Sequence, residues 1–208
     1  MTQGSFISFE GGEGAGKSTQ IRRLAERLTA AGHDVVVTRE PGGSPGAEAI
    51  RELLVNGAAD RWSPVTETLL MYASRRDHLE RVIRPALAEG KVVLCDRFAD
   101  STRAYQGAGG AASASLIAAL EDHVLNGTIP TLTLILDLPA EVGLQRAEAR
   151  GGAARFESKG LDFHQRLRAG YLEIARQEPE RCVVIDADAE LDAVTAAIAQ
   201  AVSQRLDL

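Results

Sequence analysis

Aromatic residues and long hydrophobic runs are both scarce in this sequence of 208 residues. The aromatic residues are five Phe, three Tyr and one Trp, so we expect a core built mainly from Leu, Val, Ile and Ala. No run approaches the roughly 18 consecutive apolar residues of a membrane-spanning helix, which argues against an integral membrane protein. The first residues, Met1-Thr2-Gln3-Gly4, also lack the basic start and apolar stretch of a secretory signal.

Cysteine and net positive charge are lacking as well. Cys95 and Cys182 each lie inside a short apolar run, so both are predicted to be buried free thiols. The 23 Lys and Arg are outnumbered by 29 Asp and Glu, for a formal net charge of -6. This balance argues against binding to a nucleic-acid polymer, although a small phosphorylated ligand needs only a few local cations. We expect a reduced, soluble protein of the cytoplasm with no membrane partner.

Short apolar runs alternate with longer amphipathic segments along the whole chain. The runs are bounded by Gly, Pro or acidic residues, as in strands buried on both faces; they cover residues 5–10, 34–39, 91–96, 131–137 and 182–186. Helical periodicity is found in residues 17–31, 45–56, 64–89, 113–126, 140–150, 161–178 and 191–205. This alternation indicates a parallel α/β architecture with too few strands for an eight-stranded barrel. We predict one domain over residues 1–208, with an open, doubly wound sheet.

A glycine-rich motif follows the first predicted strand. Residues 11–18 fit the pattern G-x-x-x-x-G-K-[ST] at every fixed position. Glycines let backbone N–H groups approach a phosphate, and the N-terminus of the next helix adds partial positive charge. Lys17 supplies a full charge, and the Ser18 hydroxyl is a ligand for Mg²⁺. We therefore predict that a nucleoside triphosphate binds with Mg²⁺ at Gly11, Gly12, Glu13, Gly14, Ala15, Gly16, Lys17, Ser18 and Thr19.

The residues after the third predicted strand indicate what happens to the triphosphate. No Asn-Lys-x-Asp element, which GTPases use to read guanine, follows any predicted strand. The third strand ends in Asp96-Arg97, whereas motor and remodelling ATPases usually carry Asp-Glu there. An acid at this position can hold Mg²⁺ together with Ser18, and the arginine beside it faces the phosphates. The pair favours phosphoryl transfer to a second bound anion.

Three further runs carry a family resemblance. They are Thr38-Arg39-Glu40-Pro41-Gly42-Gly43, Met71-Tyr72-Ala73-Ser74-Arg75, and Asp96-Arg97-Phe98 followed by Ser101 and Tyr105-Gln106-Gly107. Together with residues 11–18, they resemble the bacterial thymidylate kinases, from Phe6 to the last helix. The resemblance implies ATP- and Mg²⁺-dependent phosphorylation of dTMP to dTDP, a step in dTTP biosynthesis. It also implies a homodimer of a three-layer P-loop fold, in which helices flank five parallel strands and a short lid carries arginines.

The resemblance also implies roles for residues around dTMP. Arg75 corresponds to the arginine that donates to thymine O4, and Arg97 to the arginine that grips the acceptor phosphate. Tyr105 corresponds to a ring against the sugar carbon that bears the 2′-hydroxyl in ribonucleotides. Thr102 and Gln106 match positions that line base and sugar, and Glu10 and Glu13 would lie near the transferring group. The expected dTMP-binding set is Glu10, Arg39, Arg51, Met71, Arg75, Arg97, Thr102, Tyr105 and Gln106.

Two members of this set have an alternative interpretation. Met71 stands where relatives commonly carry a Phe stacked on thymine, one helical turn before Arg75. It either lies against the base through its polarizable sulfur or is a plain core methionine. Arg51 either contributes to the grip on the acceptor phosphate or lies on a solvated helix face.

A basic segment near residues 146–158 is predicted to be a mobile lid. Arg146 and Arg150 share a helix face, small residues follow at 151–154, and Arg155 comes next. The variable positions of residues 11–18 contain no basic residue, so charge on the transferring phosphoryl group must be neutralised from elsewhere. We therefore predict that Arg150 and Arg155 act in catalysis together with Lys17, Arg97 and Glu13. The alternative is a solvated surface loop.

Two other functions remain open from the sequence alone. One is a kinase of another deoxynucleotide or of a nucleoside, which an acceptor panel distinguishes. The other is a non-catalytic nucleotide-binding switch on the same fold, for which ADP release would not depend on an acceptor.

Overall fold

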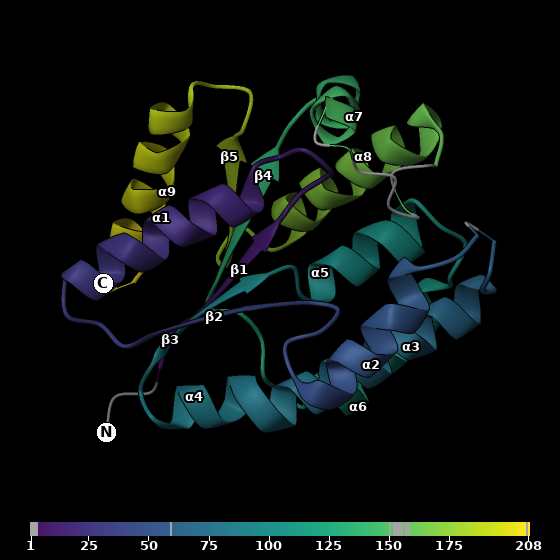
Figure 1. Ribbon diagram of the computed structural model, residues 1–208, viewed down its shortest axis with the longest axis horizontal. Coiled ribbons are helices and arrows are strands. Elements are labelled where there is room, and N and C mark those ends of the chain that lie inside the picture. Colours follow the sequence, from purple (N-terminus) through teal and green to yellow (C-terminus); the bar gives the residue numbers. More distant parts are fainter. Residues whose placement is uncertain (1–3, 59, 150, 152–155, 157–158, 207) are drawn as a thin grey trace.

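The computed structural model describes residues 4–58, 60–149, 151, 156, 159–206 and 208, and within these residues it contains one five-stranded sheet (Figure 1). The strands are β1 (Phe6–Glu10), β2 (Val35–Arg39), β3 (Val92–Asp96), β4 (Leu132–Asp137) and β5 (Cys182–Asp186). All neighbours pair in parallel, in the order β2-β3-β1-β4-β5. The predicted α/β class, the strand positions and the parallel sheet are therefore confirmed.

Each predicted helical segment is helical to within one residue at the ends that the structure describes. The segment predicted as one helix over residues 64–89 is divided into two α-helices by a π-helical turn. The elements are α1 (Lys17–Ala30), α2 (Pro45–Val55), α3 (Pro64–His78), η1 (Leu79–Ile83), α4 (Arg84–Ala88), α5 (Ala99–Thr102), η2 (Arg103–Ala108), α6 (Ala114–Leu125), α7 (Ala140–Ala149), α8 (Leu161–Gln177) and α9 (Leu191–Arg205).

The sequence analysis missed one helical segment, formed by α5 and η2 between residues 99 and 108. Its buried positions include Asp100, Thr102 and Gln106, so no apolar stripe marks the helix in the sequence. A π-helical turn such as η2 often marks a functional site. Half of the six residues that this segment buries are polar.

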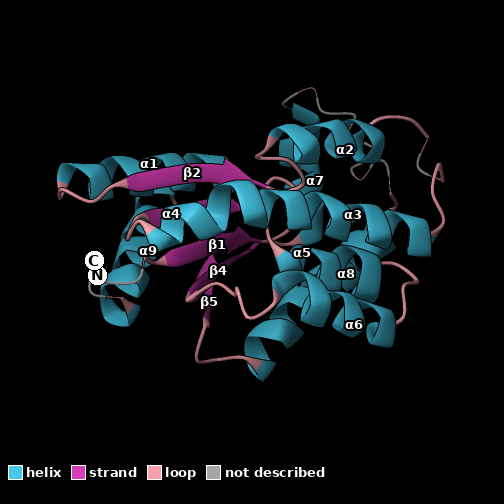
Figure 2. Ribbon diagram, turned by 90° about the horizontal axis from the view of Figure 1, so that it is seen from below, coloured by secondary structure: helices cyan, strands magenta, loops and turns pink. Residues whose placement is uncertain are grey.

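Helices cover both faces of the sheet, which makes three layers (Figure 1). On one face, α1 and α9 bury Ile21, Leu24 and Ile198 against β1 and β4. On the other face, η1, α4 and α8 pack over β1, β3 and β4. In Figure 2, β2 points toward the group of helices that includes α2, α3 and α5. The carboxyl ends of the strands therefore meet loops and helix ends, where ligands bind in open α/β sheets.

The aromatic residues are distributed unevenly in the core. The cluster under α1 and α9 is aliphatic apart from Phe9, as predicted. The opposite face instead buries Phe98, Tyr105, Phe163 and Tyr171 close to the carboxyl ends of β1 and β3. The expectation of an aliphatic core therefore holds on one face only. On the other face, aromatic rings lie near the carboxyl ends of the strands.

Two sequence predictions concern properties of the fold as a whole. Cys95 and Cys182 are both buried and unpaired, as predicted. Among the described residues, no helix has the length and apolar character needed to cross a bilayer.

Candidate active site

The glycine-rich loop between β1 and α1 has the backbone geometry of a phosphate cradle. Gly11, Gly14 and Gly16 have φ angles of 134°, 70° and 84°, which favour glycine. A Cβ on Gly14 would also collide with the carbonyl oxygen of Gly143 on α7. Lys17 begins α1, and its Nζ donates to the carbonyl oxygens of Gly11 at 3.2 Å and Gly12 at 3.0 Å.

Lys17 is buried, with the guanidinium of Arg97 close by. Burial lowers the pKa of its ammonium group to about 8, and the nearby guanidinium of Arg97 acts in the same direction. Both effects disfavour the charged form. Anionic phosphates beside Lys17 would favour it, so the binding of an anion here is coupled to protonation of this lysine.

Ser18 and Asp96 come together beside the loop, as the metal prediction requires. The Ser18 hydroxyl donates to Asp96 Oδ2 at 3.0 Å, across the gap between α1 and the end of β3. Among the described residues there is no cluster of three or more His, Cys, Asp or Glu that could hold a metal. One hydroxyl and one carboxylate nevertheless fit Mg²⁺, which takes oxygen ligands and binds through one or two protein groups plus phosphates and water.

The turn after β3 is fixed by a carboxylate from β1. Glu10 is fully buried. Its Oε1 accepts from the backbone N–H of Phe98 at 2.7 Å, and its Oε2 accepts from Ser101 Oγ at 2.6 Å and from Tyr171 OH at 3.3 Å. Between these anchors, Arg97 has a φ of 71°, a left-handed conformation that costs energy for a residue with a side chain.

The position of Glu10 differs from the one expected. We expected it near the transferring group and in contact with dTMP, but it has no exposed surface and does not line the cavity described below. Burial raises the pKa of Glu10 to about 7, and the Asp100 carboxylate acts in the same direction. Glu10 therefore positions the turn that carries Arg97 rather than facing a ligand.

Arg97 joins the phosphate loop to the turn after β3. Its Nη1 donates to the Gly11 carbonyl oxygen at 2.9 Å and to Tyr171 OH at 3.2 Å, and its Nη2 lies 3.1 Å from Glu13 Oε1. Tyr105 donates its hydroxyl to the same Glu13 oxygen at 2.6 Å. Burial alone would raise the pKa of Glu13, but the charges of Arg97 and Lys17 and the bond from Tyr105 lower it to about 2.

A cavity opens on the other side of Arg97. It is bounded by residues from β2, α2, α3, α5 and η2, at the carboxyl side of the sheet. Every predicted dTMP-binding residue except Glu10 lines it: Arg39, Arg51, Met71, Arg75, Arg97, Thr102, Tyr105 and Gln106. Residues that are far apart in the sequence are thus gathered around one space.

Arg75 is held on several sides within this cavity. Its Nε donates to Glu40 Oε2 at 2.7 Å, and its Nη2 donates to the Phe98 carbonyl oxygen at 3.0 Å and to Thr102 Oγ1 at 3.1 Å. Tyr72 stacks on the guanidinium at 4.8 Å. Nη1 is buried and has no hydrogen-bond partner among the described residues. A fixed donor with one free nitrogen suits a ligand that presents an acceptor.

Sequence reasoning assigned no role to Glu40, which supports Arg75, or to His78 behind it. Glu40 is buried and also accepts from His78 Nδ1 at 2.9 Å. Glu40 lies inside the Arg-Glu-Pro-Gly-Gly run, so its membership of that run was the only available signal. His78 lies in a long helix without any distinguishing pattern, and only the structure shows that it is buried there.

The remaining cavity residues are less tightly held. Arg51 donates Nη1 to the Pro41 carbonyl oxygen at 2.6 Å, and Arg39 forms an exposed ion pair with Glu48 at 3.2 Å. Met71 is half-buried and lines the cavity wall. Contact of these three residues with a nucleotide stays a prediction.

The predicted lid lies only partly within the described residues. Arg150 and Arg155 fall outside them. Arg146 lies within α7, where Nη1 donates to the Ala187 carbonyl oxygen at 3.1 Å and Nη2 pairs with Asp188 at 3.0 Å. Phe156 lines the cavity beside Arg97, which is called the acceptor cavity from here on, and its ring centroid lies 5.5 Å from that of Tyr105. The end of the predicted lid segment thus reaches the cavity.

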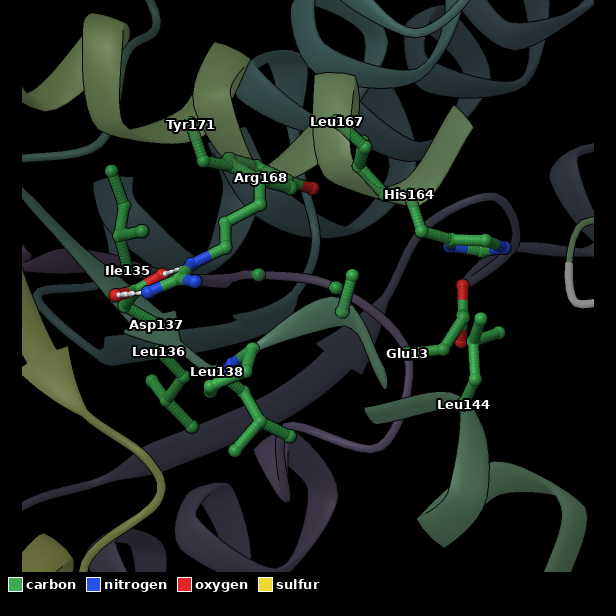
Figure 3. A pocket seen from close by; sticks show the side chains of 14 residues that line it. Glu13, Ile135, Leu136, Asp137, Leu138, Leu144, His164, Leu167, Arg168 and Tyr171 are labelled. Carbon is green, nitrogen blue, oxygen red and sulfur yellow. Dashed lines mark hydrogen bonds and ion pairs between the residues drawn. The ribbon is translucent and has the colours of Figure 1, made fainter. Parts of the chain in front are cut away.

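A smaller pocket lies on the β4 and α8 side of the phosphate loop (Figure 3). Figure 3 shows the His164 ring beside the Glu13 carboxylate, and Arg168 reaching Asp137 at the end of β4. Arg168 Nε lies 2.7 Å from Asp137 Oδ1, so Asp137 is held in an ion pair. Burial lowers the pKa of His164, so the neutral imidazole is favoured there.

These features define a phosphotransferase with a P-loop: a phosphate cradle and a second cavity share Glu13, Asp96 and Arg97 as common walls. Comparison with known proteins gives the family. The model of the thymidylate kinase family matches residues 9–198. The chain belongs to the thymidylate kinase family.

Individual relatives agree over the full length. The thymidylate kinase of Caulobacter vibrioides is 88% identical over 208 residues, covering all of both chains. That of Bradyrhizobium diazoefficiens is 55% identical over 98% of this chain and 91% of the relative. The crystal structure of thymidylate kinase from Ehrlichia chaffeensis superposes with a TM-score of 0.78 at 35% identity, over 95% of this chain and 98% of that one.

The buried carboxylate of Glu10 leads to a prediction about stability. Its pKa is about 7 in the folded protein against an ordinary value of 4.5. Between these values the folded state binds more protons than the unfolded state, so the free energy of unfolding falls as pH rises. Glu10→Gln should remove this contribution, which amounts to a slope of at most about 1.4 kcal/mol per pH unit.

Urea unfolding of both proteins between pH 4.5 and 7.5 measures this difference. Glu26→Gln, on the exposed surface of α1, is the matched control and should follow the parent chain. If the free energy of unfolding changed with pH in the same way for the parent chain and for Glu10→Gln, a raised pKa for Glu10 would be contradicted.

Proposed function

We propose that the protein transfers the γ-phosphate of ATP to dTMP, with Mg²⁺, and releases dTDP and ADP. The observation that carries this proposal is the wall shared by the phosphate loop and the acceptor cavity. Glu13, Asp96 and Arg97 border both spaces, so two nucleotides bound in them would meet phosphate to phosphate. A protein accelerates phosphoryl transfer mainly by holding donor and acceptor in line and by stabilising negative charge in the transition state.

The donor side follows from the loop and its cations. The backbone N–H groups and Lys17 would hold the ATP phosphates, while Ser18 and Asp96 would hold Mg²⁺. When bound, the metal neutralises charge on the phosphates. Arg97 lies between the two spaces and carries a fixed positive charge toward the acceptor phosphate. Burial of these groups strengthens their electrostatic effect.

The acceptor side favours a thymine deoxynucleotide. The free Nη1 of Arg75 is a donor for a carbonyl such as thymine O4, whereas cytosine presents an amino donor at that position. The Tyr105 hydroxyl is held by Glu13, so the ring is fixed in the cavity wall. A ring fixed against the sugar would exclude a 2′-hydroxyl, which would disfavour ribonucleotides.

A direct test follows ADP release with each acceptor in turn. We expect turnover only when an acceptor is present, with dTMP giving the highest kcat/KM among dTMP, dCMP and thymidine. Faster phosphorylation of dCMP or thymidine would overturn the assigned substrate. Release of ADP at the same rate without any acceptor would overturn the transfer reaction itself.

The lowered pKa of Lys17 predicts a pH profile. In the free enzyme, Lys17 loses its proton as pH rises through about 8, and kcat/KM for ATP should fall above that value, approaching tenfold per pH unit. Bound phosphates keep the lysine protonated, so kcat at saturating ATP should fall only at higher pH. A kcat/KM that stays level to pH 9.5 would show that Lys17 keeps its proton in the free enzyme.

The lid arginines lead to a separate prediction. Arg150→Ala should lower kcat by about 10³, as loss of an arginine finger does, and should change KM for dTMP only a few-fold. Arg146→Ala is the control, because Arg146 binds the Ala187 carbonyl oxygen and Asp188 in this structure. This substitution should lower kcat much less than Arg150→Ala does. An unchanged kcat with a raised KM for Arg150→Ala would assign that arginine to substrate binding alone.

The family resemblance also leads us to propose a cytoplasmic homodimer. Helices α2 and α3 present exposed Leu53, Val65 and Leu69. Exposed apolar side chains gathered on one surface commonly mark a contact between proteins. Sedimentation of the purified protein would distinguish a dimer from a monomer.

A further inference from the structure

Glu67 and Gln106 form a buried polar pair at the edge of the acceptor cavity. Gln106 lies on η2 and lines the cavity, whereas Glu67 lies in the first turn of α3 and does not. Gln106 Nε2 donates to Glu67 Oε1 at 2.8 Å. Only 2% of Gln106 and 5% of Glu67 are exposed. The pair therefore lies directly behind the cavity wall, away from solvent.

The chemistry of the pair determines which way the amide of Gln106 points. An ionised carboxylate only accepts hydrogen bonds, so it must face the NH₂ group of the amide and not its oxygen. The amide oxygen, Oε1, is consequently turned away from Glu67. It is buried and has no hydrogen-bond partner among the described residues. Without Glu67, the two ends of the amide could exchange positions at little cost.

Two residues of the cavity lining thus carry one fixed donor and one fixed acceptor that have no partner among the described residues. The donor is Arg75 Nη1, held by Glu40, and the acceptor is Gln106 Oε1, held by Glu67. The thymine edge presents the matching pair, the O4 acceptor and the N3–H donor. The cytosine edge presents an amino donor and an N3 acceptor, which mismatches both. Unpaired buried polar groups make such mismatches costly.

We propose that Glu67 is a specificity-determining residue that acts through Gln106, by holding the amide oxygen toward N3–H of the acceptor base. The proposal rests on the proposed function and adds the way in which the base is read. Glu67 itself touches no substrate and is a positioning residue. A first-turn Glu of α3 would otherwise be explained by the helix dipole alone, but that explanation does not require burial or a partner on η2.

The test compares dTMP with 3-deaza-dTMP, in which C–H replaces N3–H without added bulk, and with dCMP. For the parent enzyme, kcat/KM should be about tenfold lower for 3-deaza-dTMP, the value of one hydrogen bond. For Glu67→Gln, kcat/KM for dTMP should fall about tenfold, mainly through KM, and 3-deaza-dTMP should be almost unaffected. The ratio of kcat/KM for dTMP to kcat/KM for 3-deaza-dTMP or dCMP should therefore be smaller in Glu67→Gln than in the parent enzyme. Glu80→Gln is the matched control, because Glu80 lies on η1 and its side chain is exposed.

Two outcomes would overturn the proposal. Equal kcat/KM for dTMP and 3-deaza-dTMP in the parent enzyme would show that N3–H is not read. An equal loss on both substrates in Glu67→Gln would show a purely structural role. If Glu67→Gln fails to fold, Glu67→Asp keeps the buried charge but shortens its reach, and the same narrowing is expected. A parent enzyme that does not phosphorylate dTMP would instead refute the proposed function, which is a separate and recognisable result.

Discussion

A carboxylate buried at the end of the central strand holds together the two loops that carry the chemistry. Glu10 accepts hydrogen bonds from the backbone of Phe98 and from the side chains of Ser101 and Tyr171, so one group ties β1 to the turn after β3 and to α8. The left-handed backbone at Arg97 persists because these surroundings determine it. The guanidinium is thereby held between the phosphate loop and the acceptor cavity, before any ligand arrives.

Preorganisation of this kind explains how a chain with a net charge of -6 can bind two anions side by side. The positive groups are concentrated where two nucleotides would meet, and nearby carboxylates hold them in place. Glu13 and Glu40 each hold one arginine, Arg97 and Arg75, with a nitrogen of Arg75 left free. Burial lowers the pKa of Lys17, and the guanidinium of Arg97 acts in the same direction, so the charged form of this lysine is disfavoured until an anion binds beside it. Phosphates bound beside Lys17 would favour its charged form.

The sequence predicted the parts of the molecule that local patterns encode. The strands and most helices follow hydrophobic periodicity, and Lys17, Ser18, Asp96 and Arg97 stand in motifs whose spacing reflects chemistry. The α5–η2 segment was missed because its buried face carries Asp100, Thr102 and Gln106. Glu67 acts through Gln106, a partner distant in the chain, and no local pattern marks it. Glu40 is marked only by its membership of the Arg-Glu-Pro-Gly-Gly run, and its partners Arg75 and His78 are also distant. The burial of Glu10 beneath the turn that carries Arg97 was not foreseen, because sequence gives no measure of burial.

The most direct test of the account is a crystal structure with dTMP bound. The account predicts that the 5′-phosphate lies within about 3.2 Å of the Arg97 guanidinium, that O4 accepts from Arg75 Nη1, and that the contacts of Glu10 are unchanged. A nucleotide whose phosphate lies away from Arg97, or whose binding reshapes the turn after β3, would contradict a preformed junction between the two sites.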